Sequence, residues 1–99
     1  KEKETVSTKN DYQLAKERKS AWVKAKSALK KAEERVHTEE AALKALEERA
    51  FDPQVASDFE AAKSIYEQMD QQRSLVESCY AAWEQAEFEL TALSNFEEE

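Results

Sequence analysis

The stretch Phe51-Asp52-Pro53-Gln54 divides the chain into two halves of similar length. Pro53 is the only proline and the chain has no glycine, so the residues that stop helices are confined to this one place. Proline lacks a backbone N–H and its ring clashes with the preceding turn, yet it suits the first position of a helix. Asp52 is a good N-cap, because its carboxylate accepts from amides of the next turn. The stretch predicts a helix, a turn over 51–54 and a second helix.

Apolar residues recur every seven positions on both sides of this turn. The main lines run through Ala15, Trp22, Leu29, Val36, Leu43 and Ala50, and then through Val55, Ala62, Met69, Val76, Trp83 and Leu90. Further lines run through Ala25, Ala32 and Leu46, through Phe59, Tyr66 and Tyr80, and through Ile65, Cys79, Ala86 and Leu93. Such spacing is typical of helices that pack along a common seam.

We therefore predict an all-α fold, in which two long helices form an antiparallel coiled-coil hairpin over 11–96. The helices are expected at 11–50 and 55–95. Residues 1–10 are polar and aperiodic, which favours a frayed lead-in, and residues 97–99 form an acidic tail. One alternative stays open at this stage, namely a single long helix kinked at Pro53 within an intermolecular coil.

A fold-back centred between Asp52 and Pro53 also predicts which residues face each other, because their numbers should then add to about 105. Trp22 faces Trp83 in this register, and Glu39 faces Tyr66. On one flank the register pairs Lys26 with Glu77. The turn has to be very tight, and Phe51 lies at the tip, either packed back on the helices or offered to a partner protein.

Composition excludes several classes of function. The chain has 99 residues, 40% hydrophobic and 37% charged, which is enough for a seam but not for a large core. The absence of glycine excludes the glycine-rich loops that hold phosphates, so we expect no nucleotide or other cofactor. No constellation of base and nucleophile suggests an enzyme. We expect no membrane partner, since no apolar run approaches the roughly 20 residues of a spanning helix.

A single cysteine fits a reducing compartment, so the expected location is cytoplasmic. Cys79 is interpreted as a small packing residue, because His37 lies several helical turns from it and no other histidine is present. His37 has Glu33, Glu34 and Glu40 within about one turn, an arrangement that binds metal weakly at best and arises by chance in glutamate-rich helices. No metal site is predicted.

Charge is unevenly placed along the chain. Residues 1–31 carry ten Lys or Arg against four acids, a balance of +6, whereas 32–99 carry five against eighteen, a balance of −13. Lysines attract phosphates by proximity alone, so the basic part of the first helix is a candidate contact surface for DNA, rRNA or the ribosome. The same run also fits a calmodulin-like partner, a membrane surface or a merely solvated face. The candidate residues are Lys16, Lys19, Lys24, Lys26, Lys30 and Lys31.

The turn and the second helix resemble a known family. Phe51-Asp52-Pro53, Phe59, Tyr66 and Tyr80-Ala81-Ala82-Trp83-Glu84, followed by Glu87 and Leu90, are similar to the C-terminal coiled-coil domain of ABC-F (Uup-like) ATPases. The resemblance covers residues 12–93. It implies a non-catalytic arm of a larger ATP-binding protein that acts in translation, with DNA or RNA as the partner of the hairpin. The acidic body over 32–99 departs from a simple DNA-binding pattern.

Two functional hypotheses follow. In the first, the hairpin is a monomeric accessory arm that contacts nucleic acid or the ribosome through its six lysines. In the second, it is a structural spacer or protein-docking hairpin of a larger protein, with Phe51 at the tip as the docking residue.

Overall fold

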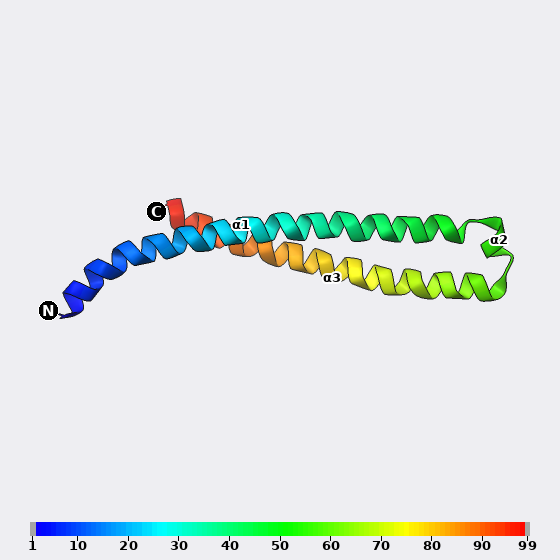
Figure 1. Cartoon of the computed structure of the whole chain (residues 1–99), viewed down its shortest axis with the longest axis horizontal. Helices are drawn as coiled ribbons and strands as arrows, with labels where there is room; N and C mark the ends of the chain where they lie inside the picture. Colours follow the sequence, from blue (N-terminus) through cyan, green and yellow to red (C-terminus); the bar gives the residue numbers. More distant parts are fainter. Residues whose placement is uncertain (1, 99) are drawn as a thin grey trace.

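The computed structural model describes the backbone of residues 2–98 and the side chains of residues 11–94. Within these ranges the chain forms helices α1 (Glu2–Ala50), α2 (Pro53–Ala56) and α3 (Phe59–Glu98), and it contains no strand. Helices α1 and α3 run side by side in opposite directions, with α2 at the turn (Figure 1). The molecule measures 79 × 20 × 14 Å. The prediction of an elongated, all-helical chain is confirmed.

The turn is longer than predicted, and it contains a helix of its own. Asp52 caps α2 as expected, its Oδ1 accepting from the backbone N–H of Gln54 at 2.9 Å. Asp58 then acts as a second cap, because its Oδ1 accepts from the amides of Glu60 and Ala61 at 3.0 and 3.2 Å. Two aspartate caps start two separate helices. The predicted turn over 51–54 and a second helix from position 55 are therefore wrong, since α3 begins at Phe59.

Both long helices also extend beyond their predicted ends. Helix α1 begins at Glu2 rather than at position 11, so the backbone of the predicted lead-in over 1–10 is helical from Glu2 onward. No proline or glycine interrupts residues 1–50, so nothing in that sequence stops the helix. Helix α3 reaches Glu98 rather than ending at 95, so residues 97 and 98 of the predicted acidic tail are helical, and residue 99 lies outside the described residues.

The predicted seam on α1 is present from Trp22 to Ala50. Val36 is its most buried residue, with 1% of its surface exposed. The other seam residues of α1 are half-buried, namely Trp22, Ala25, Leu29, Ala32, Leu43, Leu46 and Ala50. Ala15 departs from the prediction, because every residue over 11–20 is exposed. The N-terminal part of α1 projects past the end of α3, so no helix covers it there (Figure 1).

The second apolar line of α3 differs from the one predicted to face α1. Ile65 and Cys79 are buried beside the main line of Met69 and Val76. The alternative line is exposed, with Phe59 at 77%, Tyr66 at 55% and Tyr80 at 38%. Arg73, which follows Tyr66 by seven residues and so lies on the same line, extends to solvent and forms an ion pair of 3.1 Å with Asp70.

Hydrogen bonds between the helices define the register. Gln72 Nε2 donates to the backbone oxygen and to Oε1 of Glu39, at 2.9 and 2.8 Å, and the two residue numbers add to 111 rather than 105. Trp22 Nε1 donates to Ser94 Oγ at 3.2 Å. The predicted pairs of Glu39 with Tyr66 and of Trp22 with Trp83 are therefore wrong. At Glu39 and Gln72 the register is displaced by six residues, close to one heptad, or roughly 9 Å along the axis. The displacement is larger at Trp22 and Ser94, whose numbers add to 116.

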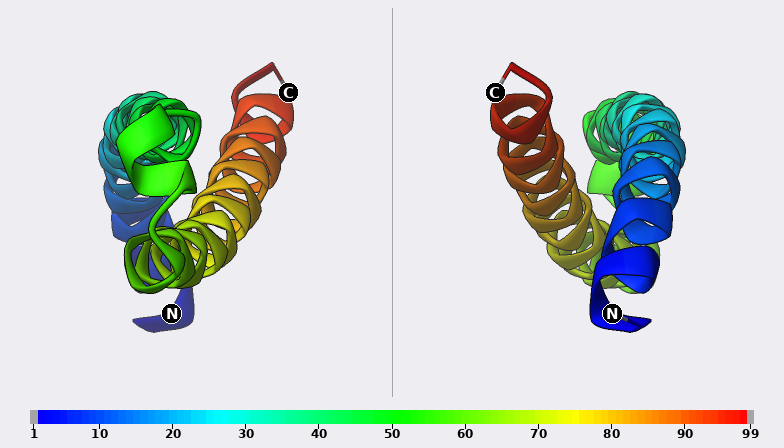
Figure 2. Two further views of the ribbon diagram at one scale, coloured as in Figure 1. Left: turned by 90° about the vertical axis from the view of Figure 1, so that its right-hand side faces the viewer. Right: turned by 90° about the vertical axis from the view of Figure 1, so that its left-hand side faces the viewer.

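The two helices cross each other along the hairpin (Figure 1). Near the turn α3 lies below α1, and at the open end its C-terminal part emerges above α1 (Figure 1). The end-on views show the same crossing (Figure 2). A crossing of this kind is compatible with a seven-residue apolar pattern.

Candidate nucleic-acid contact surface

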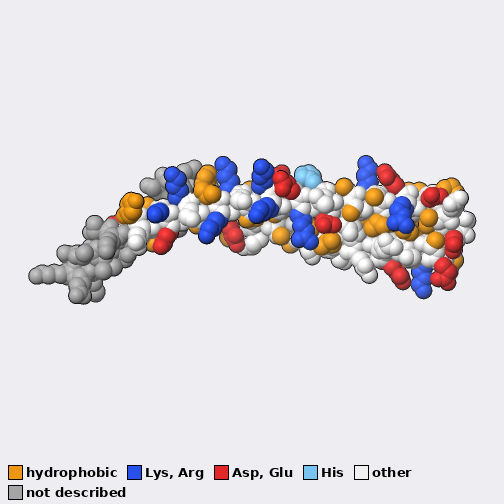
Figure 3. Space-filling view, viewed as in Figure 1, with side chains coloured by type: hydrophobic (Ala, Val, Ile, Leu, Met, Phe, Trp, Pro, Cys, Tyr) orange, Lys and Arg blue, Asp and Glu red, His pale blue; other side chains and the backbone are white. Residues whose placement is uncertain are grey.

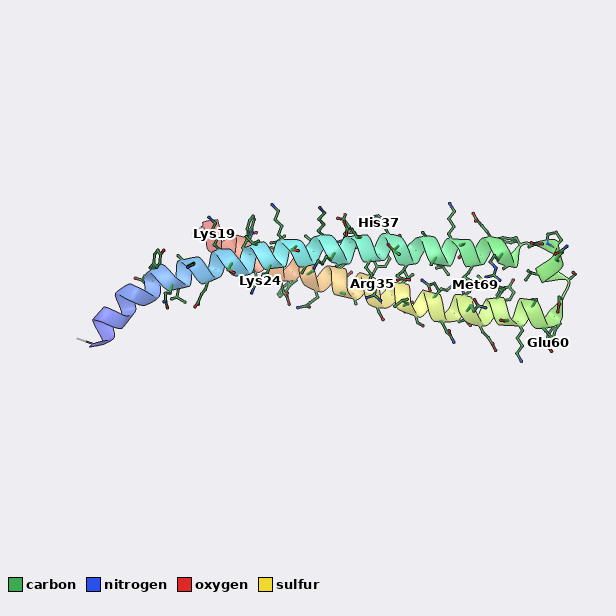
Figure 4. All side chains as sticks on the ribbon, viewed as in Figure 1. Lys19, Lys24, Arg35, His37, Glu60 and Met69 are labelled. Atoms are coloured by element: carbon green, nitrogen blue, oxygen red, sulfur yellow. The ribbon has the colours of Figure 1, made fainter. Side chains whose placement is uncertain are left out.

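All six predicted lysines lie on exposed positions of α1 and outside its buried seam. Their helical positions spread around the exposed surface of α1, with Lys19, Lys26 and Lys30 on one side of the seam and Lys24 and Lys31 on the other. Figure 4 places Lys19 and Lys24 on opposite sides of the ribbon. The set extends from position 16 to position 31, about 22 Å at 1.5 Å per residue. The structure therefore gathers these residues into a broad basic surface, with basic side chains visible along this part of α1 in Figure 3.

Most of these ammonium groups face solvent without a carboxylate partner. Among the side chains described, the ion pairs join Arg35 to Glu39 at 3.8 Å and Arg73 to Asp70 at 3.1 Å, each within one helix. Lys26 is held differently, with its Nζ 4.8 Å from the ring centroid of Trp22. This cation–π contact replaces the predicted pair with Glu77. The lysine charges are thus available to an anionic partner.

Local charge favours an anion on this part of α1. Residues 11–31 contain seven Lys or Arg against two acids, Asp11 and Glu17. Beyond them the acidic body begins at Glu33. Electrostatics would attract a phosphate backbone to the first segment and repel it from the second.

The turn presents a different kind of surface. Phe51 is 84% exposed, which answers the question that the sequence left open, because its ring does not pack back on the helices. Phe59, at the start of α3, was assigned to the seam and is exposed as well. Two exposed phenylalanines thus stand at either side of α2, next to the caps Asp52 and Asp58.

Tyr80 makes a contact that the predicted register could not reveal. Its hydroxyl donates to Oε2 of Glu40, and its ring lies 5.9 Å from that of Trp83, tilted by 36°. The bond to Glu40, with smaller effects of partial burial and of the carboxylate charge, raises the pKa of Tyr80 above its usual value. A register with residue numbers adding to 105 places Tyr80 opposite Ala25, so this bond was missed.

No feature of the described residues suggests catalysis or metal binding. His37 is exposed on the outer side of α1 (Figure 4), and the described part of the chain holds no group of three potential metal ligands. Cys79 is buried, as its interpretation as a packing residue requires. It lines an open interhelical groove of about 300 Å³ with Lys31, Ala32, Arg35, Leu75, Ser78 and Ala82. This groove is mainly apolar and holds no general base.

No protein-family model matches the chain, and neither the curated proteins nor the solved structures yield a match. In the part of the chain that the structure describes, no helix has a stretch long and apolar enough to cross a membrane.

Proposed function

We propose that this chain is a non-catalytic arm that contacts nucleic acid or the ribosome through its six exposed lysines. One observation carries the proposal: all six lysines are exposed, and among the described side chains none of them forms an ion pair with a carboxylate. Seven cations against two acids within residues 11–31 then serve to attract a phosphate backbone.

The proposed architecture of this arm is an antiparallel coiled coil. Its support is the seven-residue spacing of buried positions, with Leu29, Val36 and Leu43 on α1 and Met69 and Val76 on α3. By the resemblance of its turn and second helix, the arm belongs to a cytoplasmic ABC-F ATPase whose catalytic motifs lie outside this chain. The DNA, rRNA or ribosomal partner follows from the same resemblance.

A salt titration tests the nucleic-acid contact. Binding of fluorescent rRNA or duplex DNA should weaken steeply as salt rises, because each lysine–phosphate contact releases a counterion. The double variant K24E/K31E should lower the affinity at least about tenfold and reduce the salt slope.

The matched control is K44E/K63E, which makes the same change of charge at exposed lysines of the acidic body. It should leave binding nearly unchanged. Equal losses of affinity in the two variants would mean that the net charge of the chain, rather than this surface, governs binding. An absence of salt-sensitive binding by the wild type would exclude the proposal.

The second candidate function is docking of a protein at the tip, and the exposure of Phe51 and Phe59 favours it. Exposed aromatic side chains commonly anchor protein interfaces. The two functions separate experimentally, because F51A/F59A should abolish protein docking and leave phosphate binding intact.

A further inference from the structure

One edge of α1 carries a row of side chains spaced by seven residues, which we call the edge row. Its members share one side of the helix because the heptad spacing repeats their orientation. Its first four members are exposed and its last two half-buried. In order, the edge row consists of Tyr12, Lys19, Lys26, Glu33, Glu40 and Glu47. The charges are sorted along it, with the lysines toward the open end and the glutamates toward the turn.

The edge row shares its face with aromatic side chains of α3. The hydroxyl of Tyr80 donates to Glu40, which fixes Tyr80 on the same side of the hairpin as the edge row. Phe59 and Tyr66 lie at multiples of seven residues before Tyr80, so they follow the same side of α3. All three rings are exposed, at 77%, 55% and 38% in chain order. Exposed aromatic side chains beside sorted charges are typical of an interface.

We propose that this face binds a second copy of the chain in antiparallel orientation. Turning the edge row end for end about the point between Lys26 and Glu33 places Lys26 opposite Glu33 of the other copy. The same operation places Lys19 opposite Glu40. By twofold symmetry each contact occurs twice, which makes four lysine–glutamate pairs. A dimer of this kind goes beyond the proposed phosphate contact, which it leaves to Lys16, Lys24, Lys30 and Lys31, and it replaces the monomer expected from the sequence.

The uncharged end of the row fits the same arrangement. Tyr12, which is 73% exposed, falls opposite Glu47 of the second copy. A phenol facing a carboxylate repeats the contact that Tyr80 makes with Glu40 inside one hairpin. Every member of the edge row then meets a group of complementary chemistry.

Other binding partners complement the charges of only half of the edge row. Nucleic acid is repelled by Glu33, Glu40 and Glu47, and a uniformly basic partner is repelled by Lys19 and Lys26. A parallel second copy sets lysine against lysine and glutamate against glutamate. Of these binding partners, the antiparallel copy matches both the lysine half and the glutamate half of the edge row. Exposed ion pairs are individually weak, so the association should be salt-sensitive and modest, with an affinity of about 10 to 100 µM.

Sedimentation equilibrium on the full chain at low salt tests the proposal with two charge-reversal variants. K19E/K26E carries glutamates at all five charged positions of the edge row, and E33K/E40K carries lysines at the first four. Each variant alone should self-associate at least about tenfold more weakly than the wild type. An equimolar mixture should form a heterodimer about as readily as the wild type dimerises, because opposite charges meet again.

K16E/K30E serves as the matched control, since it changes net charge as K19E/K26E does but at exposed lysines outside the edge row. It should dimerise like the wild type. The single variants K26E and E33K keep the Tyr80–Glu40 bond and repeat the mixing test if E33K/E40K loses helicity by circular dichroism. A monomeric wild type at about 100 µM, self-association of either double variant at wild-type strength, or a mixture that stays monomeric would each overturn the proposal.

Discussion

Glu39 and Gln72 form a polar pair in the middle of an otherwise apolar seam. The Gln72 amide donates to both the backbone oxygen and the carboxylate of Glu39, which also has the Arg35 guanidinium at 3.8 Å. A polar pair at a seam position stabilises less than two apolar residues, but it disfavours every register in which its members are parted. This pair thus distinguishes the observed register from one displaced by a heptad.

Replacing Gln72 by alanine should destabilise the hairpin. The Glu39 side chain is only 21% exposed and loses its amide donor, so the free energy of unfolding should fall by about 1 to 2 kcal/mol. Urea unfolding followed by circular dichroism measures the change. Gln68→Ala is the control, because Gln68 is exposed and bonds only to Ser64 of its own helix. Equal effects of the two variants would show that the interhelical bond contributes nothing.

Tyr80 makes the stability of the hairpin depend on alkaline pH. Its pKa is raised by the bond to Glu40, so the folded chain favours the protonated phenol. The resulting stabilisation is fully present below the unfolded pKa of about 10 and is lost as pH rises through the higher folded value. Urea midpoints at about pH 8 and about pH 11 should therefore fall further for the wild type than for Tyr80→Phe. The urea midpoint of Tyr66→Phe should fall between the two pH values as much as that of the wild type. An equally large fall for Tyr80→Phe would contradict the assignment of this pH dependence to Tyr80.

At the scale of elements, the turn depends on two caps of unequal weight. Asp58 accepts two amide bonds at the start of the 40-residue α3, whereas Asp52 accepts one at the start of the four-residue α2. Asp58→Ala should therefore cost about 1 kcal/mol of stability, within the usual range of about 0.5 to 2 kcal/mol for a lost cap.

Asp52→Ala is the comparison, and it should cost less than half as much, because Pro53 already favours the first helical position. Thermal and urea unfolding of both variants measure the difference. A larger loss of stability in Asp52→Ala than in Asp58→Ala would mean that α2, rather than the cap of α3, stabilises the turn most.

The elements themselves were predictable from particular residues, and the turn was not. Trp22, Leu29, Val36 and Leu43 mark the seam of α1 because only a helix places seven-residue repeats on one side. Asp58 was overlooked because the apolar spacing around it continues on both sides, whereas a cap is a local backbone feature. Once α2 is inserted, α3 starts later and the whole register moves.

At the scale of the whole molecule, the register is the property that the sequence pattern specifies least. A slip of seven residues brings the same kinds of side chain together, so heptads alone cannot select between the two registers. Spin labels can. A label at position 44 should lie closer to one at position 68 than to one at position 61, since the two registers differ by about 10 Å along the axis. A shorter distance from position 44 to position 61 would instead support the predicted register with its tight turn. Dilution of the labelled chain with unlabelled chain removes distances between different molecules.

The basic surface was easier to predict than the contacts within the hairpin. Lys16, Lys24 and Lys31 lie off the seam in any register, so their exposure follows from the first helix alone. The Tyr80–Glu40 bond and the exposure of Phe59 depend on how α3 is aligned against α1. Single-helix properties therefore follow from the sequence, whereas properties shared by both helices require the length of the turn.

The hydrogen bond between Trp22 and Ser94 joins residues 72 positions apart, whereas the caps at the turn join near neighbours. Because loop closure costs more as the intervening chain lengthens, contacts beside the turn should form first and the hairpin should close like a zipper toward Trp22. During synthesis α1 is complete before any of α3 exists to cover it. The apolar side of α1 therefore stays exposed to solvent until α3 has been synthesised. Trp22 stays exposed longest, because its partner Ser94 lies near the end of α3.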